Sequence, residues 1–185
     1  MMDLIELQAI VGRKDPEIEA IFGPYCGAME KYEINTPRRR AMFAAQTIVE
    51  SGGYRYLEEL GSGEEYEGRA DLGNTEPGDG PRFKGRGIIQ LTGRSNYARC
   101  SSAIYGSPQV LLDNPESVSE PEVAAEAAGW YWKWKNINQN ADAGDLMGAT
   151  RKINGGLNGF TDRQRYYTRA CIVLGLASTS GTGPR

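Results

Sequence analysis

The side chains best suited to chemistry are acidic and lie close together in the chain. Glu50 ends a stretch of helical spacing, and Gly52 and Gly53 then interrupt the helix. A carboxyl group at a helix C-terminus faces the negative end of the helix dipole, which favours the protonated form that a general acid needs. Because the glycines let the chain reverse, Glu50 and Glu59 can face each other across a cleft. An inverting glycosidase uses two carboxyl groups about 6.5–9.5 Å apart, one protonated and one ionised. The alternative interpretation is that Glu50 and Glu59 are solvated glutamates near a helix end with no catalytic role.

The chain contains no histidine, which narrows the possible chemistry. Its absence excludes Ser-His-Asp and Cys-His nucleophile systems and zinc sites that use histidine. The three cysteines, Cys26, Cys100 and Cys171, are odd in number and widely spaced, so free thiols are expected. We therefore expect no metal and no cofactor, and a reaction that depends on carboxyl groups and hydroxyls.

Length and composition predict one soluble globular domain. The chain has 185 residues, of which 39% are hydrophobic and 24% charged, with a formal net charge of −3. This balance lacks the basic excess of a dedicated nucleic-acid binder. No apolar run reaches about 18 residues, and residues 1–12 lack the basic and apolar regions of a signal peptide. We expect synthesis in the cytoplasm, no nucleic-acid partner and no stable membrane association.

Capping residues and prolines mark where helices begin. Asp15 followed by a proline opens a helix that Gly23 and Pro24 are expected to end, with a separate helix from about residue 25 to 32. Thr36 followed by a proline opens the helix that carries Glu50. The other helices are expected over 3–11, 94–104, 119–134, 145–153 and 161–174.

A glycine-rich stretch over 61–87 separates the helical regions. A loop of this length is uncommon in a compact domain unless it has a function, so we interpret it as a cleft wall with room for a short β-hairpin. The apolar run over 88–92 follows, and an extended conformation would point Gln90 and Thr92 the same way. A sugar hydroxyl or N-acetyl group could then satisfy the Gln90 amide, although a purely structural amide is equally compatible.

Tryptophans are dense in the helix expected over 119–134. Trp130 and Trp134 lie one turn apart, while Trp132 points inward. Aromatic rings of this density can stack on pyranose rings, but core packing is the stronger interpretation. Together these features predict a mainly α-helical single domain over 1–176 with a glycine-rich lobe and a cleft, followed by a flexible tail over 177–185.

Three motifs in register give the sequence a family resemblance. They are ESGG at 50–53, GRGIIQLTGRSNY at 85–97 and INGGLNG at 153–159. With them the chain resembles glycoside hydrolase family 19, and most of all its bacteriophage and prophage endolysin branch, with plant and bacterial chitinases as wider relatives. The resemblance covers about residues 41–170 and includes the loop over 72–80. It implies a lysozyme-like fold and an inverting mechanism on β-1,4-linked N-acetylated sugars.

The resemblance also implies roles for individual residues. Glu50 matches the general acid of the family and Glu59 the general base. Thr92 matches a hydroxyl that helps to hold the nucleophilic water. Substrate contacts are implied for Gln90, Asn96, Tyr97, Asn154 and Arg163.

Two departures from the family pattern bear on the acid and the base. Val49 stands where the family often has histidine before the acid, so Glu50 is expected among more apolar neighbours. Leu60 stands where asparagine often follows the base, and the adjacent Glu58 could share the role of base. The nine-residue spacing favours Glu59.

The function implied by the resemblance is that of an endolysin. Such an enzyme hydrolyses the β-1,4 MurNAc–GlcNAc bond of peptidoglycan during host lysis, acts as a monomer, and reaches the wall in the periplasm after another protein has permeabilised the membrane. A chitinase acting on GlcNAc polymers is the alternative within the same class. A non-catalytic sugar-binding relative and a structural virion component are alternatives from other classes.

Overall fold

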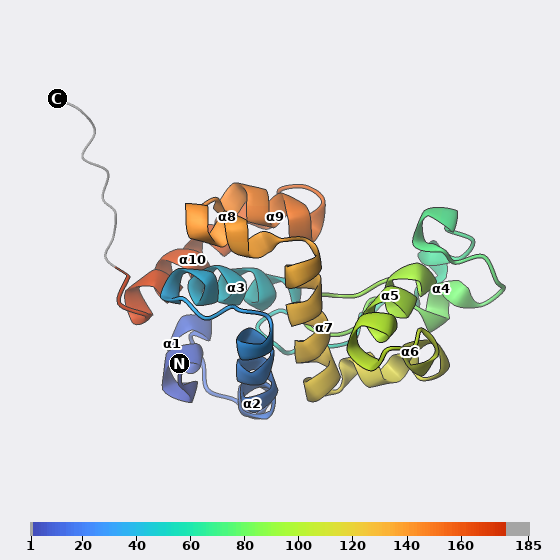
Figure 1. The fold of residues 1–185 in the computed structure, drawn as a ribbon, viewed down its shortest axis with the longest axis horizontal. Helices are drawn as coiled ribbons and strands as arrows, with labels where there is room; N and C mark the ends of the chain where they lie inside the picture. The colour runs from blue at the N-terminus through green and yellow to red at the C-terminus, as the bar shows by residue number, and fades with distance from the viewer. Residues whose placement is uncertain (1, 177–185) are drawn as a thin grey trace.

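The structure is a computed structural model that describes residues 2–176, so the tail predicted over 177–185 lies outside the described residues. The described chain is mainly helical, as predicted (Figure 1). The α-helices are α1 (Leu4–Val11), α2 (Pro16–Lys31), α3 (Pro37–Glu50), α4 (Asp79–Arg82), α5 (Arg94–Tyr105), α6 (Gln109–Asp113), α7 (Pro121–Trp134), α8 (Ile137–Ala143), α9 (Leu146–Asn154) and α10 (Phe160–Val173). Three 3-10 helices are η1 (Glu64–Tyr66), η2 (Ala70–Leu72) and η3 (Pro115–Ser119).

Two hydrophobic cores share helix α7. One core draws on α1, α2, α3, α9 and α10, and takes Ala128 and Trp132 from α7. The other lies among α5, α6 and the preceding loop, and takes Ala127 and Trp130 from α7. Figure 1 shows α7 standing between the two groups of helices. Because successive residues of one helix enter both cores, α7 fixes the two groups to each other.

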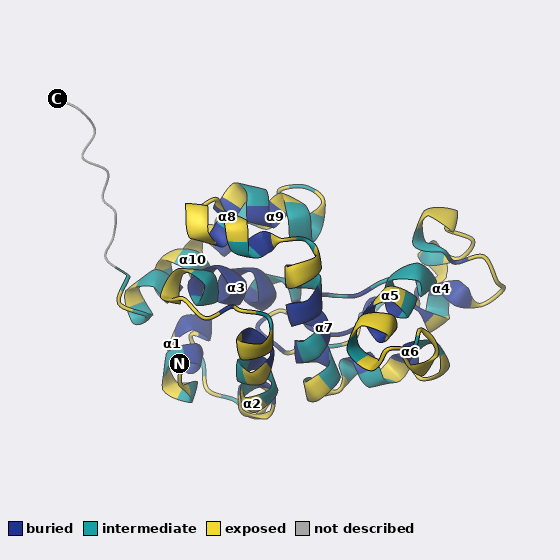
Figure 2. Cartoon of the chain, in the orientation of Figure 1, coloured by how far each residue is buried: buried dark blue, intermediate teal, exposed yellow. Residues whose placement is uncertain are grey.

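Helix α3 is the centre of the larger group. Thr36 caps its first turn by accepting the Arg39 backbone N–H at 3.2 Å, and Pro37 occupies the first helical position. Every residue over 41–48 is buried (Figure 2). Small alanines at three of these positions let neighbouring helices approach closely, and α10 packs along α3. The acid predicted at the end of α3 is therefore carried by the best-buried helix.

Helix α2 corrects the prediction that Gly23 and Pro24 end a helix. The structure has one continuous helix with Pro24 inside it. Its buried positions, Ile18, Ile21 and Tyr25, continue at helical spacing through the proline. Burial of this apolar face outweighs the backbone hydrogen bond that a proline removes.

The glycine-rich lobe, residues 61–87, contains short helices and no β-hairpin. Within the described residues, pairing of extended segments is limited to isolated antiparallel bridges of Arg86 with Glu58 and with Leu91. Side chains hold the lobe together in place of a sheet. The Glu67 carboxylate accepts the backbone N–H groups of Gly78 and Gly80 at 2.7 and 2.8 Å.

A second carboxylate fastens the lobe to α5. The Asp79 side chain is almost fully buried and pairs with Arg94, and it accepts the backbone N–H groups of Thr75 and Glu76 at 3.1 Å each. The guanidinium holds the pKa of the Asp79 carboxyl below its ordinary value. The start of α5 is thereby fixed against the loop that precedes it.

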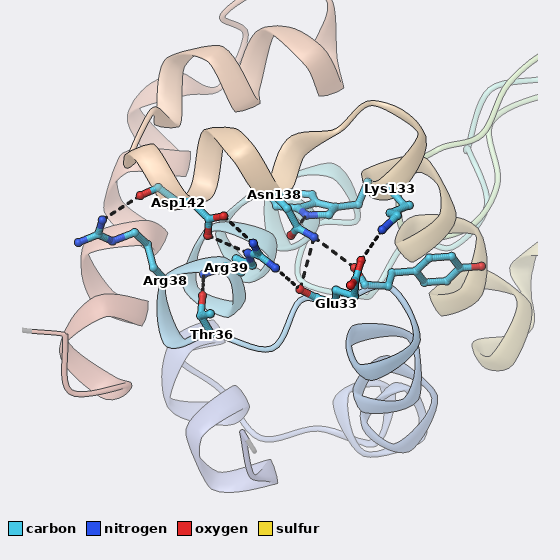
Figure 3. Close-up of polar contacts among 9 residues, drawn as sticks. Glu33, Thr36, Arg38, Arg39, Lys133, Asn138 and Asp142 are labelled. Carbon is cyan, nitrogen blue, oxygen red and sulfur yellow. Dashed lines mark hydrogen bonds and ion pairs between the residues drawn. The ribbon is translucent and has the colours of Figure 1, made fainter.

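A polar network joins α8 to the turn between α2 and α3 (Figure 3). Arg39 donates to the Asp142 carboxylate at 2.5 and 2.7 Å, and Lys133 pairs with Glu33. Asn138 accepts the indole N–H of Trp132 at 2.8 Å. These contacts place α8, and with it α9, beside α3.

Neither membrane spans nor metal clusters occur in the described part of the chain. Between residues 2 and 176, no helix combines the length and the apolar character needed to cross a membrane. The same residues include no group of three or more His, Cys, Asp or Glu side chains placed to hold a metal ion. Cys26, Cys100 and Cys171 are free thiols, and only Cys100 is fully buried.

Candidate active site

Glu50 lies where α3 stops, at the predicted position. The Ser51 hydroxyl donates to the Thr47 carbonyl at 2.7 Å and accepts the Tyr54 N–H at 2.9 Å. Gly52 and Gly53 have φ angles of +57° and +72°, a conformation that glycine adopts at little cost. The predicted stop is confirmed, and the chain leaves the helix immediately after the carboxylate.

The surroundings of Glu50 differ from the apolar environment expected from Val49. Arg163, only 2% exposed, pairs its guanidinium with Glu50, whose side chain is 14% exposed. The same guanidinium donates to Gln46 Oε1 at 2.5 Å, and the Gln46 amide donates to the Thr150 hydroxyl at 3.0 Å. A buried chain of polar contacts from α10 and α9 thus orients the carboxylate. The neighbours of Glu50 are therefore not the apolar ones that Val49 led us to expect, because a cation distant in sequence lies beside the carboxylate.

Glu59 is held by uncharged donors. The Tyr66 hydroxyl donates to Oε1 and the Gly85 backbone N–H to Oε2, each at 3.0 Å. No cation of the described residues lies within 4.0 Å of the carboxylate. Burial, followed by the hydrogen bond to Glu59, raises the pKa of Tyr66 to about 12. Tyr66 therefore keeps its proton at neutral pH and, as a hydrogen-bond donor, holds the Glu59 side chain in place.

The neighbouring Glu58 points elsewhere. Its carboxylate pairs with Lys84 at 2.9 Å and with Arg86 at 3.7 Å. The hydrogen bond from Lys84 is the main cause that lowers the pKa of Glu58. Adjacent residues of an extended segment alternate in direction. The geometry thus leaves Glu59 as the better candidate for a base.

Gln90 and Thr92 lie beside Glu59. A Cβ atom placed on Gly85 would be 2.8 Å from Gln90 Oε1 and 2.9 Å from Glu59 Oε2. It would also be 3.4 Å from Thr92 Oγ1. The three side chains therefore converge on one glycine that leaves them room.

The backbone that brings them together is not the extended segment predicted over 88–92. Arg86 and Leu91 bridge each other around a tight turn in which Gly87 and Gln90 have φ angles of +76° and +54°. The Gln90 amide donates to the carbonyls of Tyr56 and Gly87 at 3.1 and 3.0 Å. Gln90 is thus partly a structural amide, and only its Oε1 is directed at the site.

The remaining predicted contacts divide between surface and core. Asn96, in the first turn of α5, donates to the Thr92 carbonyl at 2.8 Å. Asn154 ends α9, and its buried Oδ1 has no hydrogen-bond partner among the described residues. Tyr97 is fully buried, and its hydroxyl donates to the Lys84 carbonyl at 2.7 Å. The predicted substrate contact of Tyr97 is therefore wrong, because this ring belongs to the core under the lobe.

Three residues beside the candidate carboxylates, Gln46, Tyr131 and Tyr66, are not among those that the sequence predicted. Gln46 lies one turn before Glu50 on the same face of α3, a spacing that could have indicated it. Tyr131 donates to the Lys152 carbonyl at 3.1 Å, and burial followed by the charge of Glu50 raises its pKa. Tyr66 lies within the glycine-rich lobe, where no periodicity marks it.

Comparison with known proteins identifies the family. A family model described as chitinase class I, glycoside hydrolase family 19, matches residues 40–151. The chain belongs to glycoside hydrolase family 19. A family 19 domain-containing protein of Haemophilus influenzae is 29% identical over 188 residues, covering 84% of this chain and 90% of that protein. An endochitinase of Arabidopsis thaliana is 36% identical over 163 residues, covering 84% of this chain and 52% of that protein.

Solved structures agree in fold. Chitinase C from Streptomyces griseus has a TM-score of 0.77 at 24% identity, covering 99% of this chain and 78% of that chain. A class IV family 19 chitinase from Zea mays has a TM-score of 0.69 at 21% identity, covering 96% and 92% of the two chains. This family 19 chain spans about half the length of its plant endochitinase relatives. It is a glycoside hydrolase, and the chitinases of its family are inverting glycosidases.

Proposed function

We propose that this family 19 glycoside hydrolase is an endolysin that cleaves the β-1,4 MurNAc–GlcNAc bond of peptidoglycan. The observation that carries the proposal is the pair of differently held carboxylates, Glu50 against a buried guanidinium and Glu59 among neutral donors. The choice of peptidoglycan is supported by the loop over 72–80, which resembles the endolysin branch.

In the proposed reaction, Glu50 is the general acid. Its protonated carboxyl transfers the proton to the glycosidic oxygen as the bond to the anomeric carbon breaks. Arg163 then stabilises the carboxylate that remains, because its guanidinium already contacts Glu50 Oε1. Glu50 must regain a proton before the next turnover.

Glu59 is the general base of the same reaction. It removes a proton from a water molecule that attacks the anomeric carbon from the opposite face, so the product has the inverted configuration. Thr92 donates to the Gln90 carbonyl at 2.9 Å, which leaves its oxygen free to accept a hydrogen bond from that water. Gln90 Oε1, Asn96 and the unpartnered Asn154 Oδ1 are the proposed contacts to the sugar.

Chitin hydrolysis is the second candidate. The family description and the plant endochitinase relatives favour it.

For the endolysin, the first candidate, the proposed setting is the bacterial periplasm. The enzyme acts there as a monomer and reaches the wall after another protein has permeabilised the membrane.

Product analysis by mass spectrometry distinguishes the two candidates. Purified Gram-negative peptidoglycan and colloidal chitin are digested in parallel with the protein and with its Glu50→Gln variant. We expect muropeptides with reducing MurNAc ends, no chitin oligomers, and a loss of at least about 10²-fold in the variant. Chitin oligomers alone would identify a chitinase, and no product from either polymer would refute hydrolysis of both.

A further inference from the structure

A cluster of aromatic and basic side chains lies outside the carboxylate site. Trp130 and Trp134 of α7 stack with ring centroids 5.3 Å apart, and Trp134 is 41% exposed. The Arg99 guanidinium and the Lys135 ammonium lie 5.5 and 4.0 Å from the centroid of the Trp134 ring. We call these four residues the Trp134 platform. Arg99, Trp130 and Trp134 border a hollow of about 500 Å³ between α5 and α7.

The two cations of the platform have no acidic partner. Among the described residues, no carboxylate lies within 4.0 Å of Arg99 or Lys135, whereas the adjacent Lys133 pairs with Glu33. The chain as a whole carries a net charge of −3. Each cation is attracted to the Trp134 ring through its own cation–π contact. A carboxylate that reaches either cation would gain charge-assisted hydrogen bonds.

Helices α5 and α7 each carry both a platform residue and a neighbour of the carboxylate site. On α5, Arg99 lies one turn after Asn96, which contacts the Thr92 carbonyl. On α7, Trp134 meets the edge of Tyr131 at 5.6 Å between centroids. Tyr131 in turn experiences the charge of Glu50. A polymer bound at the carboxylates could therefore reach the platform.

We propose that the Trp134 platform binds the carboxylates of peptidoglycan stem peptides, an inference that rests on the proposed function. Arg99 and Lys135 pair with the carboxylates, and the exposed part of Trp134 packs against the apolar groups beside them. Chitin carries no stem peptides and no carboxylates. The platform thus gives the enzyme a means of preferring peptidoglycan over a neutral polymer of the same linkage.

Binding to insoluble sacculi tests the proposal without requiring hydrolysis. Sedimentation measures the bound fraction of the wild-type protein and of the double variant Arg99→Glu/Lys135→Glu. A control variant, Lys14→Glu/Arg151→Glu, makes the same change of net charge at exposed residues outside the platform. We expect the platform variant to bind native sacculi at least about 10-fold more weakly than the control. Thermal unfolding monitored by circular dichroism verifies that both variants are folded.

Chemical neutralisation of the polymer provides the complementary test. Carbodiimide with excess ammonia converts the stem-peptide carboxyls to amides and leaves the glycan intact. We expect the wild type to bind amidated sacculi as weakly as the platform variant binds native sacculi. Equal binding of native and amidated sacculi by the wild type, or equal binding of native sacculi by the platform and control variants, would overturn the inference. Failure of the proposed function has a separate sign, because it is the absence of muropeptide products from the wild type.

Discussion

Replacing Arg163 with leucine tests whether the buried cation holds the acid in place. The Glu50 side chain is 14% exposed, and among the described residues no cation other than Arg163 lies within 4.0 Å of it. The substitution therefore removes its only described ion pair and also the donor to Gln46 Oε1. Removing one partner of a buried ion pair costs about 3–5 kcal/mol, because the other charge stays buried. In a domain of this size each kcal/mol lowers the midpoint of thermal unfolding by about 2–4 °C. We therefore expect the midpoint of the Arg163→Leu variant to fall by ~6–20 °C at pH 7.

The same helix supplies a matched control. Arg165 pairs with Asp162 at 3.0 Å on the surface of α10, where the two side chains are 59% and 56% exposed. An exposed pair of this kind contributes about 0–1 kcal/mol, so Arg165→Leu should change the midpoint by a few degrees at most. Adding Glu50→Gln to Arg163→Leu removes the stranded charge and should recover part of the lost stability.

Thermal and urea unfolding followed by circular dichroism measure these effects. The reasoning is refuted if Arg163→Leu and Arg165→Leu destabilise the protein equally. It is also refuted if the double variant with Glu50→Gln is no more stable than Arg163→Leu alone, because the cost would then not come from an uncompensated carboxylate.

Three further predictions concern the base, its glycine neighbour and the loop. Glu59→Gln should lower kcat by at least about 10²-fold. Glu58→Gln should keep most activity, because the Glu58 carboxylate is 45% exposed and is directed at Lys84 and Arg86. Equal losses in steady-state kinetics would reject this assignment. Gly85→Ala should lower kcat at least about 10-fold with the fold retained, since the new Cβ would lie 2.9 Å from Glu59 Oε2. Gly27→Ala is the control, because a Cβ there meets nothing within 4 Å, and it should be neutral or stabilising. Asp79 has a pKa lowered from 3.8, so its contribution to stability is present above that value and is lost as the pH falls through the lowered pKa. The stability deficit of Asp79→Asn in urea unfolding should therefore shrink below about pH 3.8, and a constant deficit would contradict it.

Local signals in the sequence predicted most of the helical fold. Asp15 and Thr36 accept backbone N–H groups at the starts of α2 and α3, as their positions before proline and a helical pattern indicated. The glycines after Glu50 stop α3 where expected. These features depend on neighbours within a few residues, so the sequence alone contains the information that determines them.

Features that depend on distant partners could not be predicted in the same way. Gln46 and Arg163 are 117 residues apart, and nothing in the helical pattern of either segment indicates that they meet. Local propensity predicts that a helix ends at Pro24, but the buried face of α2 continues past the proline and keeps the helix intact. The sequence predicts an extended Gln90, but the structure gives it an αL backbone. The bridge between Arg86 and Leu91 imposes that conformation, and the residue type of Gln90 does not indicate it.

The two carboxylates are held by parts of the protein that differ in local stability. Glu50 ends a helix whose residues over 41–48 are all buried, while Glu59 receives a hydrogen bond from a lobe that Glu67 and Asp79 hold together through individual polar contacts. Regions with few buried apolar contacts open locally at lower free energy than a helical core. Amide hydrogens over 61–85 should therefore exchange with solvent sooner than those of α3. In rising denaturant the enzyme should lose turnover reversibly while its helices remain folded, because the base loses its orientation before the acid does.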